Sequence, residues 1–136
     1  MTLVVDASAI AELLLGTPDG RAVGQMIGSE DLVAPAHLGA EVASVVRGWS
    51  LGGHLSDDRA RTAFAEFRQL GVQQLPLDGL LELAWDLRHN LSAYNALYVV
   101  VARALGCQLL TLDRRLAAAA PDCALIPEGR GEGKRS

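Results

Sequence analysis

Positive charge is scarce in this sequence, which has a single lysine, Lys134, and a formal net charge of −4. With no overall basic field to attract nucleic acid, any binding of RNA or DNA must be local or mediated by a metal ion. The two cysteines, Cys107 and Cys123, have no partner at metal-ligand spacing, so we expect reduced core residues. Neither a membrane-spanning apolar run nor a signal-peptide pattern is present, so we expect a cytoplasmic protein with no membrane contact.

Strand-like and helix-like segments alternate along the chain. Half of the 136 residues are hydrophobic, which suits one globular domain with its own core. The alternation predicts an α/β fold of three layers, a central parallel sheet of about five strands flanked by helices. We expect this domain over residues 1–128 and a disordered polar tail over 129–136. The expected strands are 3–5, 32–35, 72–77, 107–112 and 124–126, and the expected helices are 7–15, 19–27, 36–51, 56–70, 78–87, 92–105 and 116–120.

Asp6 directly follows the first expected strand, 3–5, which is apolar and rich in valine. Ligands in open α/β sheets bind at the carboxyl ends of strands, beside the point where the strand order reverses, so Asp6 is a site candidate. Aspartate is also a favoured helix N-cap residue, and this sequence pattern alone does not separate the two roles.

Glu41 is the second candidate, an acid inside a helix pattern. It stands three residues after Leu38 and four before Val45, and therefore shares the side of the apolar residues. A buried carboxylate needs a metal, a basic group or a raised pKa. The alternative is that Glu41 lies at the edge of the apolar stripe and is solvated.

The segment 91–116 contains two further candidates. Ser92 can cap a helix that is apolar on every side from Ala96 to Ala102, so this helix should be buried, with Asn95 in its first turn. The strand that follows ends at Asp113, which makes it the second strand to end in an acid.

Acids at the ends of adjacent strands become neighbours, and clustered carboxylates repel one another unless a divalent cation neutralises them. Oxygen ligands favour Mg²⁺ or Mn²⁺ over zinc. Phosphatases and phospho-receiver domains also place aspartates at strand ends, but they typically use a lysine near the phosphoryl group, and Lys134 lies in the tail. Aspartyl phosphatases would also need an acid at the position of Ser8.

These residues resemble the PIN-domain ribonucleases, in particular the VapC-type toxins of bacterial toxin–antitoxin pairs. The resemblance covers nearly the whole chain up to the tail. It is carried by four segments in the right order and spacing: 4–9, Pro35 with Glu41-Val42, 91–98 and 110–116.

The resemblance implies a metal-dependent endoribonuclease that hydrolyses phosphodiester bonds in RNA. Asp6, Glu41 and Asp113 would hold Mg²⁺ (or Mn²⁺), with Ser8 and Thr111 as polar supports. The ion would activate a water molecule and polarise the phosphate. The implied partners are a VapB-type antitoxin, RNA and a second copy of the chain in a homodimer. Positive potential for RNA could come from Arg114 and Arg115, although arginines at a helix start are often simply solvated.

Asn95 departs from the family, which usually has aspartate there. An amide oxygen can still ligate Mg²⁺, but with one charge fewer the site should hold a metal less tightly. Asn95 also occupies a capping-box position and could bond back to the amide of Ser92. The alternative function is therefore a catalytically weak or inactive PIN-like module that binds RNA or its antitoxin.

Overall fold

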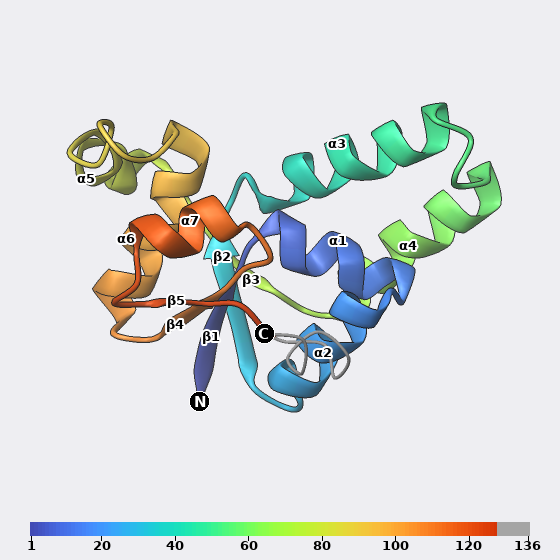
Figure 1. The fold of residues 1–136 in the computed structure, drawn as a ribbon, viewed down its shortest axis with the longest axis horizontal. Coiled ribbons are helices and arrows are strands. Elements are labelled where there is room, and N and C mark those ends of the chain that lie inside the picture. Colours follow the sequence, from blue (N-terminus) through green and yellow to red (C-terminus); the bar gives the residue numbers. More distant parts are fainter. Residues whose placement is uncertain (128–136) are drawn as a thin grey trace.

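A parallel five-stranded sheet forms the centre of the molecule, in the spatial order β3-β2-β1-β4-β5 (Figure 1). The computed structural model describes residues 1–127, so the predicted tail at 129–136 lies outside the described residues. The strands are β1 (Thr2–Val5), β2 (Asp31–Pro35), β3 (Gln73–Leu75), β4 (Gln108–Leu110) and β5 (Ala124–Leu125). The predicted parallel α/β fold is confirmed.

The strand order reverses next to β1. From β1 the chain moves to β2 and β3 on one side, and later to β4 and β5 on the other. The register pairs Val4 of β1 with Val33 on one side and with Leu109 on the other. Because all four pairings are parallel, the strands end at a common edge, and the carboxyl ends of β1 and β4 lie side by side there.

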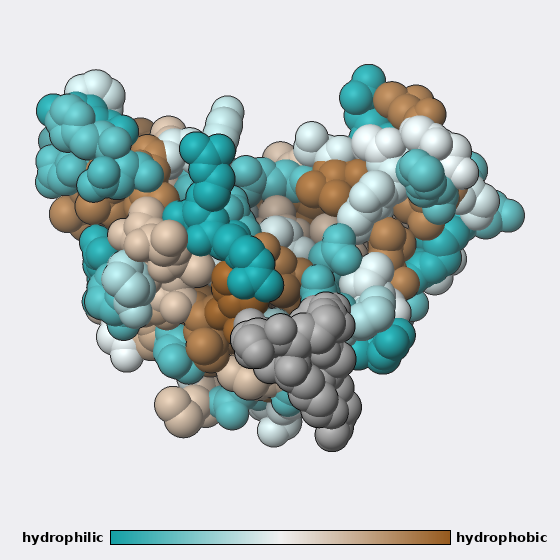
Figure 2. Space-filling view, viewed as in Figure 1, coloured by the Kyte–Doolittle hydropathy of each residue, from teal (hydrophilic) through white to brown (hydrophobic). Residues whose placement is uncertain are grey.

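Within residues 1–127, seven α-helices cover the sheet (Figure 1). They are α1 (Ala7–Leu15), α2 (Pro18–Ile27), α3 (Leu38–Leu51), α4 (Asp57–Gln69), α5 (Leu81–Trp85), α6 (Ala93–Leu105) and α7 (Arg114–Ala119). Figure 1 shows α1 to α4 on one side of the sheet and α5 to α7 on the other. In the space-filling view of Figure 2, the upper outline dips between these two sides, above the carboxyl ends of the strands.

Helix α6 is buried, as its apolar sequence predicted. Every residue from Ala96 to Ala102 is buried, and Tyr98 is among the largest fully buried side chains. The helix begins after Ser92, whose hydroxyl accepts a hydrogen bond from the backbone N–H of Asn95 at 3.1 Å. It ends at Gly106, which has the left-handed conformation. Local signals therefore define both ends of this helix.

Two sequence expectations about helix starts were wrong. The helix expected over 19–27, with Asp19 as its possible cap, begins at Pro18 and is capped by Thr17 instead. The Thr17 hydroxyl accepts a hydrogen bond from the Gly20 amide at 3.0 Å, and Pro18 takes the first helical position, where a missing N–H has no cost. The helix expected over 78–87 is a short 3-10 turn at Asp78–Leu80 followed by the five-residue α5. Neither of these two short elements has a side-chain N-cap bond.

Gly20 permits the close approach of α1 and α2. A Cβ atom at this position would lie 1.9 Å from the backbone oxygen of Glu12. We predict that Gly20→Ala lowers the free energy of unfolding by at least about 2 kcal/mol, because the two backbones must separate. Gly48→Ala in α3 is the matched control, since its Cβ would meet nothing within 4 Å. This control should raise stability by about 0.5–1 kcal/mol. Urea denaturation of both variants measures the difference, and equal stabilities would contradict the prediction.

Candidate functional site

Asp6 lies at the end of β1, where it is 3% exposed. Its Oδ1 accepts hydrogen bonds from the Ser8 hydroxyl at 2.7 Å and from the Ala9 amide at 3.0 Å, and its Oδ2 accepts one from the Thr111 hydroxyl. Asp6 is thus the N-cap of α1 and also a buried carboxylate with three donors. Burial raises the pKa of Asp6, its three hydrogen bonds oppose the rise, and the nearby charge of Asp113 adds to it.

Thr111 and Ser8 join the ends of β1 and β4. The fully buried Thr111 hydroxyl donates to Asp6 and accepts the Asp113 amide at 3.0 Å. The Ser8 hydroxyl donates to Asp6 and accepts the Leu112 amide at 2.9 Å. Each hydroxyl therefore links the carboxylate to the backbone that follows β4.

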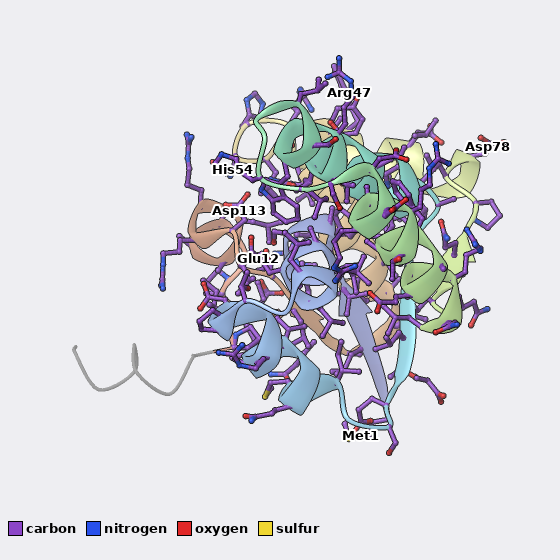
Figure 3. All side chains as sticks on the ribbon, turned by 90° about the vertical axis from the view of Figure 1, so that its right-hand side faces the viewer. Met1, Glu12, Arg47, His54, Asp78 and Asp113 are labelled. Carbon is purple, nitrogen blue, oxygen red and sulfur yellow. The ribbon has the colours of Figure 1, made fainter. Side chains whose placement is uncertain are left out.

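Asp113 follows β4 and caps α7. Its Oδ1 accepts hydrogen bonds from the amides of Arg115 at 2.9 Å and Leu116 at 3.1 Å, whereas its Oδ2 faces Asn95. Figure 3 shows Asp113 at the start of α7, far from Met1 at the other end of the sheet. Oδ1 of Asp113 thus caps α7, whereas Oδ2 points toward Asn95.

Asn95 faces Asp113. The Asn95 Nδ2 atom is 3.4 Å from Asp113 Oδ2, a long hydrogen bond between α6 and the end of β4. The predicted capping-box bond to the Ser92 amide is not formed among the described residues, since the side chain points across to Asp113 instead. A polar cavity of about 250 Å³ adjoins this pair, lined by Asn90, Leu91, Ser92, Asn95, Asp113, Arg115 and Leu116.

Glu41 lies in the first turn of α3, and its side chain is 29% exposed. Its Oε1 accepts a hydrogen bond from the Tyr98 hydroxyl at 2.7 Å and lies 3.5 Å from His37 Nε2. Burial, and then the Glu41 hydrogen bond, raise the pKa of Tyr98, so the hydroxyl stays protonated and remains a donor. Glu41 is therefore neither simply solvated nor fully buried, because it has polar partners on one side.

The candidate ligands all offer oxygen atoms, as Mg²⁺ and Mn²⁺ prefer. The charge of Asp113 helps to raise the pKa of Asp6, and a cation would relieve this repulsion. The donor chemistry therefore fits such an ion. Within residues 1–127, however, no three acidic, histidine or cysteine side chains are grouped closely enough to hold a metal. That Asp6, Glu41 and Asp113 share one ion stays a prediction.

Comparisons with known proteins agree with this arrangement. The PIN domain family matches residues 3–121. The chain is 43% identical over 114 residues to Ribonuclease VapC9 of Mycobacterium tuberculosis, covering 84% of this chain and 87% of the relative. It is 40% identical over 125 residues to Ribonuclease VapC3 of the same organism, covering 91% of each. The chain belongs to the PIN-domain family and is of the VapC type.

Two solved structures support the fold of this VapC-type chain. PAE2754 from Pyrobaculum aerophilum superposes with a TM-score of 0.67 at 21% identity, covering 91% of this chain and 83% of that one. Mycobacterium tuberculosis VapC20 is described as a sarcin-ricin loop cleaving toxin. It superposes with a TM-score of 0.63 at 22% identity, covering 86% of this chain and 94% of that one. At these identities the likeness shows the fold alone.

Most of the residues singled out in the sequence meet at one edge of the PIN domain. Asp6, Ser8 and Thr111 form one hydrogen-bonded group, and Asn95 and Asp113 form a pair beside it. Arg114 and Arg115 are both exposed, and of these two only Arg115 lines the polar cavity. No helix among the described residues is long and apolar enough to cross a membrane.

The sequence analysis missed Tyr98 and His37. Tyr98 is a tyrosine within an otherwise apolar buried helix, and a buried tyrosine hydroxyl usually has a hydrogen-bond partner. That was the available signal. For His37 the only local signal is its position four residues before Glu41, because its contacts with Tyr94 and Tyr98 arise only where α3 and α6 meet.

Thr111 offers a test of the hydrogen-bonded group around Asp6. We predict that Thr111→Val, which keeps the shape, lowers the free energy of unfolding by about 1–3 kcal/mol, because the buried carboxylate loses a donor and the Asp113 amide loses its acceptor. The matched control is Thr62→Val in α4, whose exposed hydroxyl bonds only the Asp58 carbonyl, with an expected change within about 0.5 kcal/mol. Thermal and urea unfolding of the metal-free proteins measure the change in the free energy of unfolding for each variant. An equally small effect at Thr111 would show that these hydrogen bonds add nothing to stability.

Proposed function

We propose that this chain is a metal-dependent endoribonuclease toxin of a VapBC-type toxin–antitoxin pair. The observation that carries the proposal is the pair of aspartates, Asp6 and Asp113, at the carboxyl ends of the adjacent parallel strands β1 and β4. Asp6 is buried although burial disfavours its charge, which is a cost that proteins commonly retain at functional sites. The relatives named VapC ribonucleases, at 36–43% identity, support the same activity.

Asp6 and Asp113, with the amide oxygen of Asn95 and the carboxylate of Glu41, would hold Mg²⁺ or Mn²⁺. Such an ion supplies Lewis-acid activation of water and of the scissile phosphate. The protein's own part is orientation: Ser8 and Thr111 hold the Asp6 carboxylate in place, and the α7 amides hold that of Asp113. The exposed guanidinium of Arg115, beside the polar cavity, can attract an RNA phosphate to the acidic rim.

The alternative is a weak or inactive PIN-like module that binds RNA or an antitoxin. The observation in its favour is Asn95, which donates a hydrogen bond to Asp113 where a carboxylate would add a further negative charge. Fewer anionic ligands mean a lower affinity for a hard cation. Metal-dependent cleavage by the pure protein separates the two functions.

We further propose a VapB-type antitoxin, an RNA substrate and a second copy of this chain as partners, in the cytoplasm. The VapC names of the relatives support the antitoxin and the RNA. For the homodimer, the support is a set of exposed apolar side chains on and near α5, which an assembly would cover: Leu81, Leu83 and Trp85. The sarcin-ricin loop is cleaved by VapC20, and at 22% identity this target cannot be assigned to the present chain.

Asp6→Asn is the central test. We predict that this variant loses metal-dependent RNA cleavage and keeps the fold. The amide can accept from Ser8 and Ala9 and donate to Thr111, so it replaces the carboxylate's hydrogen bonds but not its charge. The assay is cleavage of total bacterial RNA and of labelled mixed-sequence RNA with Mg²⁺ or Mn²⁺, with circular dichroism and a melting curve for each protein.

Two controls accompany this assay. Chelation with EDTA should stop the wild-type reaction, and returning Mn²⁺ should restore it. The Asp6→Asn protein, purified identically, reveals any contaminating ribonuclease. Full activity in Asp6→Asn would reject the assignment of Asp6, and no metal-dependent cleavage by the wild type would favour the binding module.

Asn95→Asp tests the departure from the family pattern. A fourth carboxylate should tighten Mg²⁺ or Mn²⁺ binding, so that cleavage saturates at a lower metal concentration. Without metal, repulsion between the new acid and Asp113 should lower the melting temperature, and added metal should reverse this, because a ligand bound only by the folded state stabilises it.

The measurement is a calorimetric metal titration beside cleavage of a labelled RNA. Asn90→Asp is the matched control: it places the same charge on an exposed residue of the same cavity, and it should change metal affinity much less. If Asn95→Asp alters neither affinity nor rate, Asn95 is not a ligand, and the metal site contains only Asp6, Glu41 and Asp113.

A further inference from the structure

The buried hydroxyl of Tyr98 contacts the acid of α3 in the candidate site. Tyr98 is 1% exposed, and its hydroxyl donates a 2.7 Å hydrogen bond to Glu41 Oε1. The same hydroxyl lies beside the backbone of Ala7 and within range of the charge of Asp6. The Tyr98 hydroxyl therefore bonds the acid of α3 and lies near the backbone that follows Asp6.

Helix α6 directs two neighbouring side chains toward the acids. Asn95 and Tyr98 are three residues apart and share a face of the helix. Asn95 contacts Asp113, and Tyr98 contacts Glu41. Because α6 is buried along most of its length, it is a rigid support for both contacts.

The ring of His37 packs against Tyr98 and lies near Glu41. Its ring is 8% exposed, and its centroid lies 4.7 Å from that of Tyr98 and 5.9 Å from that of Tyr94. Its Nε2 is 3.0 Å from the Tyr94 carbonyl, which can only accept a hydrogen bond, so Nε2 carries the proton. The ring is thereby held against both Tyr98 and Glu41.

We propose that Tyr98 is a positioning residue, which fixes the orientation of the Glu41 carboxylate and so prepares it to serve as a metal ligand. This inference depends on the function proposed above. Glu41 is 29% exposed, and without the hydroxyl its long side chain is free to turn into solvent. A ligand that is already ordered loses less conformational entropy when it binds. Side chains that orient metal ligands in this way commonly change metal affinity or activity by about 10- to 100-fold.

Tyr98→Phe removes only the hydroxyl and keeps the packing of the ring. We expect this variant to bind Mn²⁺ about tenfold more weakly by isothermal calorimetry. At limiting Mn²⁺ its kcat for cleavage of a labelled RNA should fall while KM for the RNA stays unchanged, and saturating Mn²⁺ should restore kcat. A purely structural role would not produce recovery by metal.

Tyr94→Phe is the matched control. Tyr94 lies one turn earlier in α6 and is 63% exposed, and the described residues make no hydrogen bond to its hydroxyl. Its removal should leave Mn²⁺ affinity unchanged. If both variants weaken Mn²⁺ binding equally, the effect does not come from the contact with Glu41, and the proposal is overturned.

A double-mutant cycle with Glu41→Ala, which removes the acceptor of this hydrogen bond, tests whether Tyr98 acts through Glu41. The free energy of unfolding is measured without metal for the wild type, both single variants and the double variant. We expect the two changes to be non-additive, because they disrupt the same hydrogen bond. Strict additivity would overturn the proposal even if Tyr98→Phe were less active.

The experiments distinguish this inference from the proposed function. If the wild type cleaves RNA with Mn²⁺ and Tyr98→Phe matches it in affinity and kcat, the positioning role is wrong and the function stands. If the wild type neither binds Mn²⁺ nor cleaves RNA, the proposed function is wrong, and a metal-positioning role for Tyr98 is rejected with it.

Discussion

The buried carboxylate of Asp6 is the constraint on which the rest of the site depends. A carboxylate that is 3% exposed is costly unless donors surround it, and here the Ser8, Ala9 and Thr111 groups all donate. Two of these donors also accept hydrogen bonds from the backbone after β4. The requirement to satisfy one acid therefore ties the ends of β1 and β4 together, and this places Asp113 beside Asp6.

The two sides of the site are held by different means. The strand ends are fixed by the parallel ladder and by buried hydroxyls, whereas Glu41 lies on a helix and is held by the Tyr98 side chain. Helix α6 joins the two sides, because Asn95 near its start contacts Asp113 and Tyr98 on the same face contacts Glu41. This helix therefore determines how the two sides are arranged relative to each other.

Local sequence signals predicted the fold well where they were unambiguous. Apolar runs marked strands such as β1 and β4, and Ser92 marked the start of α6, which the structure confirms. The failures came where two signals competed or none was strong. At 17–19, both Thr17 and Asp19 can cap a helix, and Pro18 favours the residue before it. At 78–87, leucine spacing indicated one helix, whereas the structure has a 3-10 turn followed by the short α5.

By itself the sequence determined the strand and helix order, the two acids at strand ends and the capping of α6 by Ser92, because these features depend on residues only a few positions apart. Only the tertiary structure decided what Asn95 and Glu41 contact. Asn95 could bond its own helix start or face the acids, and its side chain turned to Asp113, which is 18 residues away. Glu41 accepts a hydrogen bond from Tyr98, which is 57 residues away. Such contacts depend on how α3, α6 and the sheet pack, and packing brings together residues that no local pattern relates.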